Sequence, residues 1–302
     1  MAIFRKARVD EKTGRTQEQN QSLMKLIKRV HSVVEHEDIQ KHRQSQDSFG
    51  ALLGNSREMD IEAVDVEGMH CEWVRVRRPH AKRRVILYCH GGGYSTGSCI
   101  YARTLTTKLA AAASMDVFCF DYRLAPEHPY PSAPQDAMKA WNYLMLQGFG
   151  ASAGGNLALS LALTLKEQGR FLPRGLVLLS PWTDLTASGK SHESRAEVDP
   201  VLDAEYLREM TENYAPGEDC RDPHISPLFA DFTGFPATYI QVGDNEVLLS
   251  DSSRLQKNMH HAGVPVRLDI FEGMWHVFQM SPFKTAIEAM DRCAEFILEI
   301  CV

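Results

Sequence analysis

RVILYCHGGGY, residues 84–94, contains the pattern that decides the fold: a short, continuously apolar run that ends in a polar, glycine-rich turn. Four more apolar runs follow it along the chain: MDVFCF (115–120), RGLVLLS (174–180), ATYIQVG (237–243) and VRLDIF (266–271). Helix-forming segments separate or follow these runs, at 101–113, 133–146, 153–168, 251–262 and 284–300. Strands of this kind are typical of parallel sheets that helices cover on both faces. The sequence therefore predicts an α/β fold with a mostly parallel central sheet flanked by helices.

The segments outside this alternation have patterns of their own. Residues 59–78 alternate apolar and polar positions around Glu67-Gly68, which predicts a half-exposed antiparallel hairpin. Residues 1–50 are polar with one apolar stripe at helical spacing, so we expect an amphipathic helix that lies on another part of the molecule, either as a packing helix or as a lid over a site. The long interruption at 183–236 is typical of functional insertions rather than of plain connections.

The bulk composition excludes several classes of protein. The 302 residues carry a formal net charge of -6, which disfavours binding to nucleic acid or to an anionic membrane surface. No apolar run approaches the roughly 20 residues of a membrane helix, and the first residues lack the pattern of a secretory signal. The seven cysteines include no C-x-x-C pair, which favours buried free thiols in the cytoplasm. The scattered histidines do not predict a metal site.

The polar ends of three predicted strands hold the candidate chemistry, because reacting groups of an α/β sheet gather at the carboxyl ends of its strands. The first is HGGGY, residues 90–94. Consecutive glycines allow positive φ and close approach of the backbone to a ligand, so their N–H groups suit a developing oxyanion. A plain glycine turn is the alternative. A phosphate-binding loop is disfavoured because the lysine of G-x-x-x-x-G-K is absent.

The second candidate is GASAG, residues 150–154, a G-x-S-x-G that leads directly into a helix-forming segment. Small neighbours suit the tight turn on which a nucleophilic serine, here Ser152, is presented, and the N–H of Ala153 would be a further oxyanion donor. A small-residue helix start is the bland alternative. A serine also needs a base to take its proton.

The base and its acid are expected farther along the chain. His276 follows the predicted strand 266–271 in a loop, from which its imidazole could reach Ser152. The carboxylate that orients this histidine is expected after the strand 237–243, where Asp244, Glu246 and Asp251 compete for the role. Asp251 is expected to cap the following helix instead. Spacing alone does not separate Asp244 from Glu246.

Together these motifs resemble those of bacterial esterases of the hormone-sensitive lipase family, which are α/β-hydrolases. The matching segments occur in the family's order from about residue 70 to 280: HGGGY (90–94), DYRLAPEHPYPSAPQD (121–136), GASAGGNLAL (150–159), SPWTDL (180–185), DPHISPL (222–228), GDNEVLLSDS (243–252) and GMWHVF (273–278). The resemblance implies hydrolysis of carboxylic esters through an acyl-enzyme, without a metal or another cofactor.

The resemblance also implies roles for individual residues. Ser152 would be the nucleophile and His276 the general base, then acid; Glu246, in EVLLS, is preferred over Asp244 as the triad acid. The oxyanion donors would be Gly91, Gly92 and Ala153. His90 would shape the loop through hydrogen bonds, and Tyr122, Arg123, Glu127 and Asp136 would brace it.

A helical cap over a catalytic domain is a further implication of the resemblance. Residues 1–50 would form the N-terminal part of the cap and residues 186–218 an insertion that completes it, while 51–302 form the α/β-hydrolase domain. Side chains from both parts of the cap, together with one from the glycine loop, are expected to line the substrate pocket: Tyr94, Met24, Tyr206, Met210 and Tyr214. Ordinary packing is the alternative for the cap residues.

The chain departs from the family pattern in two places. The usual aspartate beside the nucleophile is Ala151, which we expect to have modest consequences because it is not a triad member. In addition, only fifteen residues separate Asp136 from Ser152, about ten fewer than usual, and they do not accommodate both a helix and a buried strand of average length. Either NYLMLQGF (142–149) is the strand that delivers the serine, or a segment between Gly148 and Phe149 is missing.

The leading hypothesis is therefore a serine carboxylesterase for short- to medium-chain acyl esters, acting on small molecules in the cytoplasm. An amidase or deacetylase with the same triad and a non-catalytic ligand-binding protein on this fold are the alternatives. We expect no nucleic-acid partner and no stable membrane insertion. The state is a monomer or a homodimer, for which the last strand (266–271) and the helix after it would offer a surface at the sheet edge.

Overall fold

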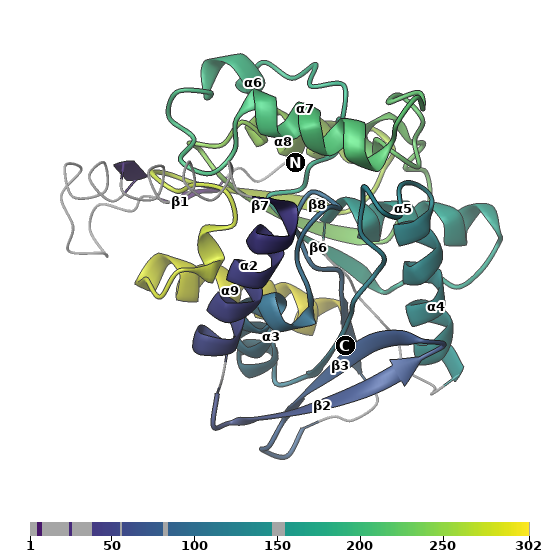
Figure 1. Ribbon diagram of the computed structural model, residues 1–302, viewed down its shortest axis with the longest axis vertical. Helices are drawn as coiled ribbons and strands as arrows, with labels where there is room; N and C mark the ends of the chain where they lie inside the picture. Colours follow the sequence, from purple (N-terminus) through teal and green to yellow (C-terminus); the bar gives the residue numbers. More distant parts are fainter. Residues whose placement is uncertain are drawn as a thin grey trace.

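The computed structural model describes residues 5–7, 24–25, 38–54, 56–80, 84–146 and 155–301. Figure 1 shows strands in the centre, helices on both sides of them, and α6 and α7 above. Ser152 and Ala153 lie outside the described residues, as does the apolar stripe of residues 23–34 apart from Met24.

One four-stranded sheet has the order β2-β3-β5-β4, with β2 Met59–Val66, β3 Met69–Val76, β4 Val85–Tyr88 and β5 Asp116–Phe120. β2 and β3 form the predicted antiparallel hairpin, and Glu67 and Gly68 make its turn with φ of 54° and 79°. β3 is also antiparallel to β5, whereas β4 is parallel to β5. β4 and β5 are buried along their whole length, as their continuous apolar runs predict.

The other four-stranded sheet has the order β1-β8-β7-β6 and is parallel throughout. Its strands are β1 Arg5–Ala7, β6 Gly175–Leu179, β7 Ala237–Gly243 and β8 Val266–Phe271. β8 was expected at the edge of the sheet. That expectation is wrong, because β1 pairs with residues Asp269 to Phe271 on its outer side.

The α/β fold with a mostly parallel arrangement is confirmed, but the described strands form two sheets rather than one. β4 ends the first sheet and β6 ends the second. Within the described part of the chain, no strand joins these two edges. The alternative in which residues 142–149 give way to a strand is wrong for residues 142–146, because α4 Ser132–Leu146 is helical to its end.

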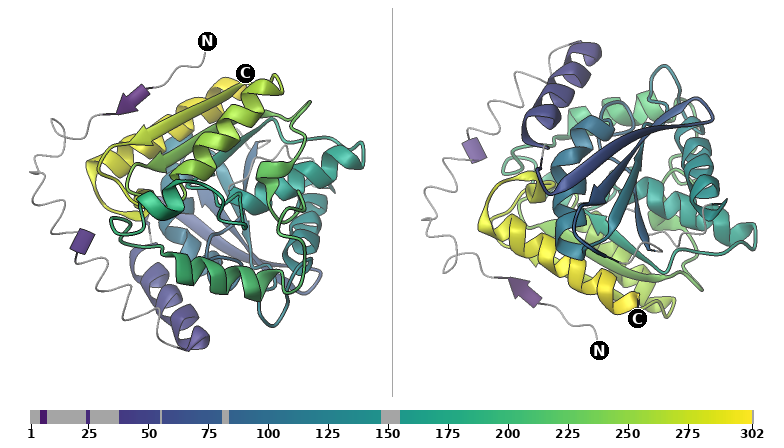
Figure 2. Two further views of the ribbon diagram at one scale, coloured as in Figure 1. Left: turned by 90° about the horizontal axis from the view of Figure 1, so that it is seen from above. Right: turned by 90° about the horizontal axis from the view of Figure 1, so that it is seen from below.

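The longer helices divide between the two faces of the sheets. α3 Cys99–Ala113 and α9 Lys284–Ile300 share one apolar core with side chains of β4 and β6. On the other face, α4, α5 Gly155–Glu167 and α8 Leu249–His261 share the second core with Phe118, Leu176 and Ile240. Figure 2 shows the yellow α9 across the molecule from the teal α4 and α5. Both faces are therefore covered, as predicted.

The remaining elements include α6 and α7, which lie above the strands in Figure 1, together with α2 and two 3-10 turns. They are α2 Ile39–Leu53, α6 Ser191–Ser194, α7 Ala204–Tyr214 and the 3-10 turns η1 Pro227–Phe229 and η2 Phe278–Met280. α2 packs closely on α3, since a Cβ on Gly50 would lie 2.2 Å from the carbonyl oxygen of Ile100. The division into a cap and a catalytic domain stays a prediction.

Candidate active site

A buried carboxylate and a loop histidine form a pair beyond the ends of β7 and β8. Glu246 is fully buried, and its Oε2 lies 3.2 Å from Nδ1 of His276. The two loops approach closely because β7 ends in glycine: a Cβ on Gly243 would lie 2.3 Å from the carbonyl oxygen of Met274. With Nδ1 facing the carboxylate, Nε2 is the nitrogen that can exchange a proton with a substrate or a nucleophile.

Ser180, at the end of β6, connects this acid to the histidine loop. Its hydroxyl donates to Oε1 of Glu246 at 2.8 Å and accepts from the backbone N–H of Val277 at 3.2 Å. The N–H of Gly243 donates to the same carboxylate oxygen. Sequence reasoning missed Ser180, although its place directly after a predicted parallel strand was a usable signal. These donors hold the Glu246 carboxylate in one orientation.

The two competing aspartates have other partners. Oδ1 of Asp244 accepts from the N–H of Gly273 at 2.7 Å, and burial raises the pKa of this carboxyl group. Asp251 does not cap α8, which begins after Leu248 without a side-chain cap, so that expectation is wrong. The geometry thus favours Glu246 as the partner of His276.

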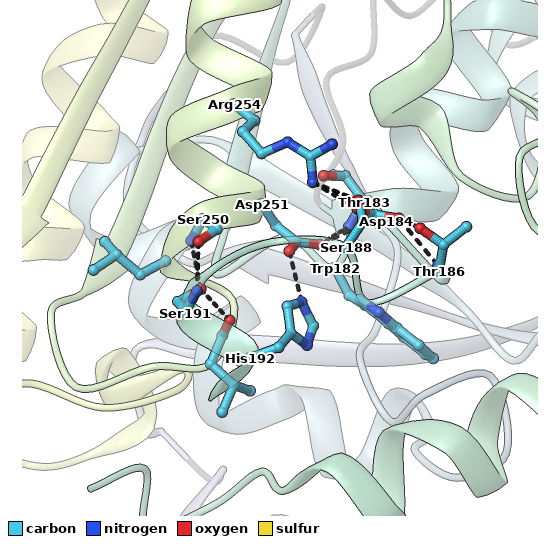
Figure 3. Close-up of polar contacts among 12 residues, drawn as sticks. Trp182, Thr183, Asp184, Thr186, Ser188, Ser191, His192, Ser250, Asp251 and Arg254 are labelled. Carbon is cyan, nitrogen blue, oxygen red and sulfur yellow. Dashed lines mark hydrogen bonds and ion pairs between the residues drawn. The ribbon is translucent and has the colours of Figure 1, made fainter. Parts of the chain in front are cut away.

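Asp251 instead joins α8 to the segment after β6 (Figure 3). Its Oδ2 accepts from the N–H groups of Thr183 and Asp184, both at 2.9 Å, and its Oδ1 lies 3.0 Å from Nε2 of His192 in α6. Arg254 in α8 also pairs with Asp184 at 2.6 Å. α8, the helix that follows Glu246, is therefore fixed to the segment after β6.

The glycine loop adopts the positive φ values and the close backbone approach that its sequence predicts. Gly92 and Gly93 adopt φ of 122° and 57°, and a Cβ on Gly92 would lie 2.2 Å from the carbonyl oxygen of Thr96. Within the described part of the chain, the backbone N–H groups of Gly91 and Gly92 have no hydrogen-bond acceptor. Two donors are thus available to a ligand at the carboxyl end of β4.

Residues around the loop brace it, as predicted for His90 and Tyr122. Nδ1 of His90 lies 2.9 Å from the carbonyl oxygen of Gly91, and its ring stacks on Tyr122 at 4.0 Å. The hydroxyl of Tyr122 donates to the carbonyl oxygen of His90 at 2.9 Å. Burial lowers the pKa of His90, so the ring acts as a neutral packing and hydrogen-bonding group.

A second buried carboxylate, Asp199, lies near Glu246 and was missed by sequence reasoning. Its Oδ1 accepts from the N–H groups of Val201 and Leu202, and its Oδ2 accepts from the N–H of Val247. Burial, and secondarily the nearby charge of Glu246, raise the pKa of Asp199 to about 6. No local sequence pattern marks Asp199, because only the folding of the segment between β6 and β7 brings it close to Glu246.

A cavity of about 700 Å³ lies between the glycine loop and the histidine loop. Gly91, Gly92 and His276 line it, and so do two of the predicted substrate-binding residues, Tyr94 and Tyr206. Gly155, three positions after Ser152 in the sequence, also lines it. The cavity thus brings His276 together with the glycine loop and two of the predicted substrate-binding residues.

Three other predicted pocket residues are placed differently. Met210 lies behind Gly93, whose added Cβ would meet its Cγ at 2.9 Å, and Tyr214 stacks on Tyr94 at 3.7 Å. Met24 packs against the core cluster that contains Trp275. None of the three is among the described residues that line the cavity.

The start of α5, directly after the nucleophile segment, is fixed by Asn156. Its Oδ1 accepts from the hydroxyl of Tyr94 at 2.8 Å, and its Nδ2 donates to the carbonyl oxygens of Trp182 at 2.7 Å and Ile225 at 3.2 Å. This side chain joins the glycine loop, the segment after β6 and the helix that follows Ser152. Asn156 lies in the segment GASAGGNLAL, which sequence reasoning recognised as a motif without assigning a role to this residue.

Two searches of the described residues concern other classes of site. They contain no group of three or more His, Cys, Asp or Glu side chains suited to holding a metal ion. None of the helices within the described ranges has the length and apolar character that crossing a bilayer requires.

The fold and the site define an α/β-hydrolase, and comparisons with known proteins agree. Residues 86–280 match the family model of the alpha/beta hydrolase fold. An esterase of Acinetobacter venetianus is 36% identical over 83% of this chain and 86% of that protein. An acetyl-hydrolase of Streptomyces hygroscopicus is 37% identical over 80% of this chain and 83% of its own.

Solved structures give the same result. The crystal structure of an esterase from the bacterial hormone-sensitive lipase family has a TM-score of 0.86 at 28% identity, covering 93% of this chain and 98% of that one. A hormone-sensitive lipase homologue from a metagenome library has a TM-score of 0.87 at 33% identity, covering 95% and 100%. The chain belongs to the α/β-hydrolase family, among its esterases of the hormone-sensitive lipase type, and it is a carboxylic ester hydrolase.

Proposed function

We propose that this protein is a serine carboxylesterase for short- to medium-chain acyl esters, with Ser152 as nucleophile, His276 as general base and Glu246 as triad acid. The observation that carries the proposal is the fully buried Glu246 carboxylate 3.2 Å from Nδ1 of His276, whose ring lines the same cavity as the glycine loop. Relatives named acetyl-hydrolase and ethyl acetate hydrolase support small acyl groups.

The reaction follows from these roles in two balanced halves. As Oγ of Ser152 attacks the carbonyl carbon, Nε2 of His276 takes the hydroxyl proton, and the carbonyl π electrons move to the oxygen. The tetrahedral intermediate collapses, the C–O bond to the alcohol breaks, and the alcohol oxygen receives the proton from His276. Water then repeats the sequence on the acyl-enzyme and releases the carboxylic acid.

The N–H groups of Gly91, Gly92 and Ala153 would stabilise the oxyanion in both halves. Where such donors have been removed from other enzymes, each accounts for roughly 2.7–4 kcal/mol of the barrier. The negative charge of Glu246 stabilises the imidazolium that forms on His276, and the Ser180 hydroxyl keeps the carboxylate in place.

The proposal includes the cytoplasm as the place of action and a monomer or homodimer as the state. All seven cysteines are free and five are buried, which suits a reducing compartment. The net charge of -6 disfavours binding to nucleic acid. Sedimentation velocity at several protein concentrations distinguishes the two states.

Hydrolysis of p-nitrophenyl esters from acetate to palmitate tests the activity, with Ser152→Ala as control. We expect turnover of the short and medium esters by the wild-type chain and loss of turnover in the variant. An organophosphate should form a covalent adduct on the Ser152 peptide, detected by mass spectrometry. Turnover equal in both proteins, with both shown to be folded, would contradict the proposal; faster cleavage of the matching p-nitroanilides would favour an amidase.

A further inference from the structure

The cavity at the candidate active site extends inward, between the edges of the two sheets. Beyond the glycine loop and His276, apolar side chains from four elements line it. We call this part the inner chamber and define it by Ile86 of β4, Val177 of β6, Leu105 and Leu109 of α3, and Met290 and Ile297 of α9. The inner chamber is thus bounded by both sheet edges and by the two helices that cover one face.

The helices show how far the inner chamber reaches below the catalytic groups. α3 begins directly after the glycine loop, and Tyr101, in its first turn, lines the same cavity as Leu109. At 1.5 Å per residue, the eight positions between them correspond to about 12 Å along the helix. In α9 the interval from Met290 to Ile297 corresponds to about 10 Å by the same rise. The cavity is therefore deep as well as capped.

The chemistry of the walls restricts what fits inside. The six defining side chains are aliphatic or a thioether, and Cys293, which also faces the cavity, is buried with a raised thiol pKa. Among the described residues that define the chamber there is no charged group. Water gains no polar partners from such walls, whereas an apolar ligand gains contacts. The polar end of a ligand would remain at the mouth, beside Gly91, Gly92 and His276.

We propose that the inner chamber binds the unbranched acyl chain of the ester substrate, and that octanoyl and decanoyl esters are better substrates than acetyl esters. This inference rests on the proposed esterase function and narrows its substrate class. The aliphatic chain would run between β4 and β6 toward Leu109 and Ile297, while the ester carbonyl stays at the glycine loop. Each methylene transferred from water to an apolar site gains about 0.8 kcal/mol, or roughly fourfold in binding.

The acyl-chain dependence of kcat/KM tests the proposal. With p-nitrophenyl esters kept monomeric in solution, we expect kcat/KM to rise by about two- to fourfold per methylene from acetyl to octanoyl or decanoyl. Ile297→Phe, at the deep end, should shift the optimum to a shorter chain. Leu105→Phe, nearer the mouth, should shorten the optimum further.

Leu298→Phe is the matched control, because Leu298 is the neighbour of Ile297 in α9 but is 47% exposed. It should keep the wild-type profile. An unchanged profile in both chamber variants, or a wild-type optimum at acetyl, would overturn the inference and leave the esterase function intact. If a phenylalanine variant fails to fold, Ile297→Met, which lengthens the side chain without an aromatic ring, makes the same comparison.

Ligand binding gives a measurement that does not depend on catalysis. A ligand that binds only the folded state raises the unfolding temperature with its concentration. Decanoate should stabilise the wild-type chain and Leu298→Phe, and should stabilise Ile297→Phe much less, whereas acetate should have no such effect. Equal increases of the unfolding temperature with decanoate for all three proteins would show that decanoate does not bind in the inner chamber, and would overturn the inference. If no ester is hydrolysed but decanoate still stabilises the wild type more than Ile297→Phe, the inner chamber binds aliphatic chains and the proposed esterase function is wrong.

Discussion

Glu246 and Asp244 are two positions apart after β7, yet their side chains have different partners. Glu246 faces His276, whereas Asp244 accepts from Gly273. We predict that Glu246→Gln lowers kcat by about 10²- to 10⁴-fold with little change in KM, because a neutral amide cannot stabilise the imidazolium and favours the wrong tautomer. Asp244→Asn should cost less than about tenfold. Steady-state kinetics on p-nitrophenyl butyrate compare them, and equal losses would contradict the assignment.

Asp199 makes the stability of the protein depend on pH. Its pKa is raised by burial to about 6, above the value of about 4 for an unfolded aspartate. Because the pKa of Asp199 is higher in the folded state, the folded state loses free energy of unfolding as this carboxyl group ionises. The loss begins above about pH 4 and continues as the pH rises through about 6.

We predict that the stability difference between the wild type and Asp199→Asn changes across this window. The free energy of unfolding of the wild type, relative to the variant, should fall by up to about 3 kcal/mol from pH 4 to pH 6.5, because only the wild type must ionise a buried carboxyl group. Urea unfolding at a series of pH values measures the difference. Asp203→Asn, at the exposed N-cap of α7, is the control, and a constant difference for Asp199→Asn would be inconsistent with this account.

At the scale of elements, α2 braces the glycine loop. Arg43 donates to the carbonyl oxygens of Ser95 at 2.8 Å and Ala125 at 2.9 Å and pairs with Glu127 at 2.8 Å. The side-chain oxygen of Gln46 accepts from the N–H of Gly97 at 2.9 Å. α2 is therefore hydrogen-bonded to Ser95 and Gly97, in the turn that follows the glycine loop, and this favours a positioning role over that of a free lid.

We predict that Arg43→Ala lowers kcat by about tenfold while KM changes little. The carbonyl oxygens of Ser95 and Ala125 would lose the side chain that donates to them, and the N–H groups of the glycine loop would lose their alignment with the transition state. Lys41→Ala, on the exposed side of the same helix, should have no effect. Kinetics on an acetyl ester, where the inner chamber is not used, isolate the effect on the loop. An increase in KM alone would indicate a role in substrate binding instead.

The elements show where sequence reasoning succeeded and where it could not. The continuous apolar runs predicted β4 to β8, and the alternating pattern predicted the hairpin of β2 and β3. Both predictions succeeded because the burial of a strand determines the pattern of apolar residues within that strand. Ser180 and Asp199 were missed because their roles depend on contacts with Glu246, 66 positions away for Ser180. The short β1 was not expected either, since three residues carry no periodicity. Long-range packing, rather than local propensity, decides such contacts.

At the scale of the whole molecule, the short interval between Asp136 and Ser152 has a structural counterpart. α4 extends to Leu146, and the described strands form two sheets that end at β4 and β6. Edge strands in a core leave backbone N–H and C=O groups without the partners that a neighbouring strand would provide, which costs stability. The proposed inner chamber lies between the same two strands, so under that proposal one feature affects both substrate range and stability.

This connection leads to a prediction for a lengthened chain. Inserting about ten residues between Gly148 and Phe149, enough for one strand and its connection, should raise the urea midpoint and the m-value, because a strand between β4 and β6 would unite the sheets and bury more surface. The same variant should retain acetyl ester hydrolysis and lose the preference for decanoyl esters, because the strand would occupy the inner chamber. An insertion of equal length rich in glycine and serine is the control. A midpoint no higher than that of the control would show that the two sheets do not need a joining strand.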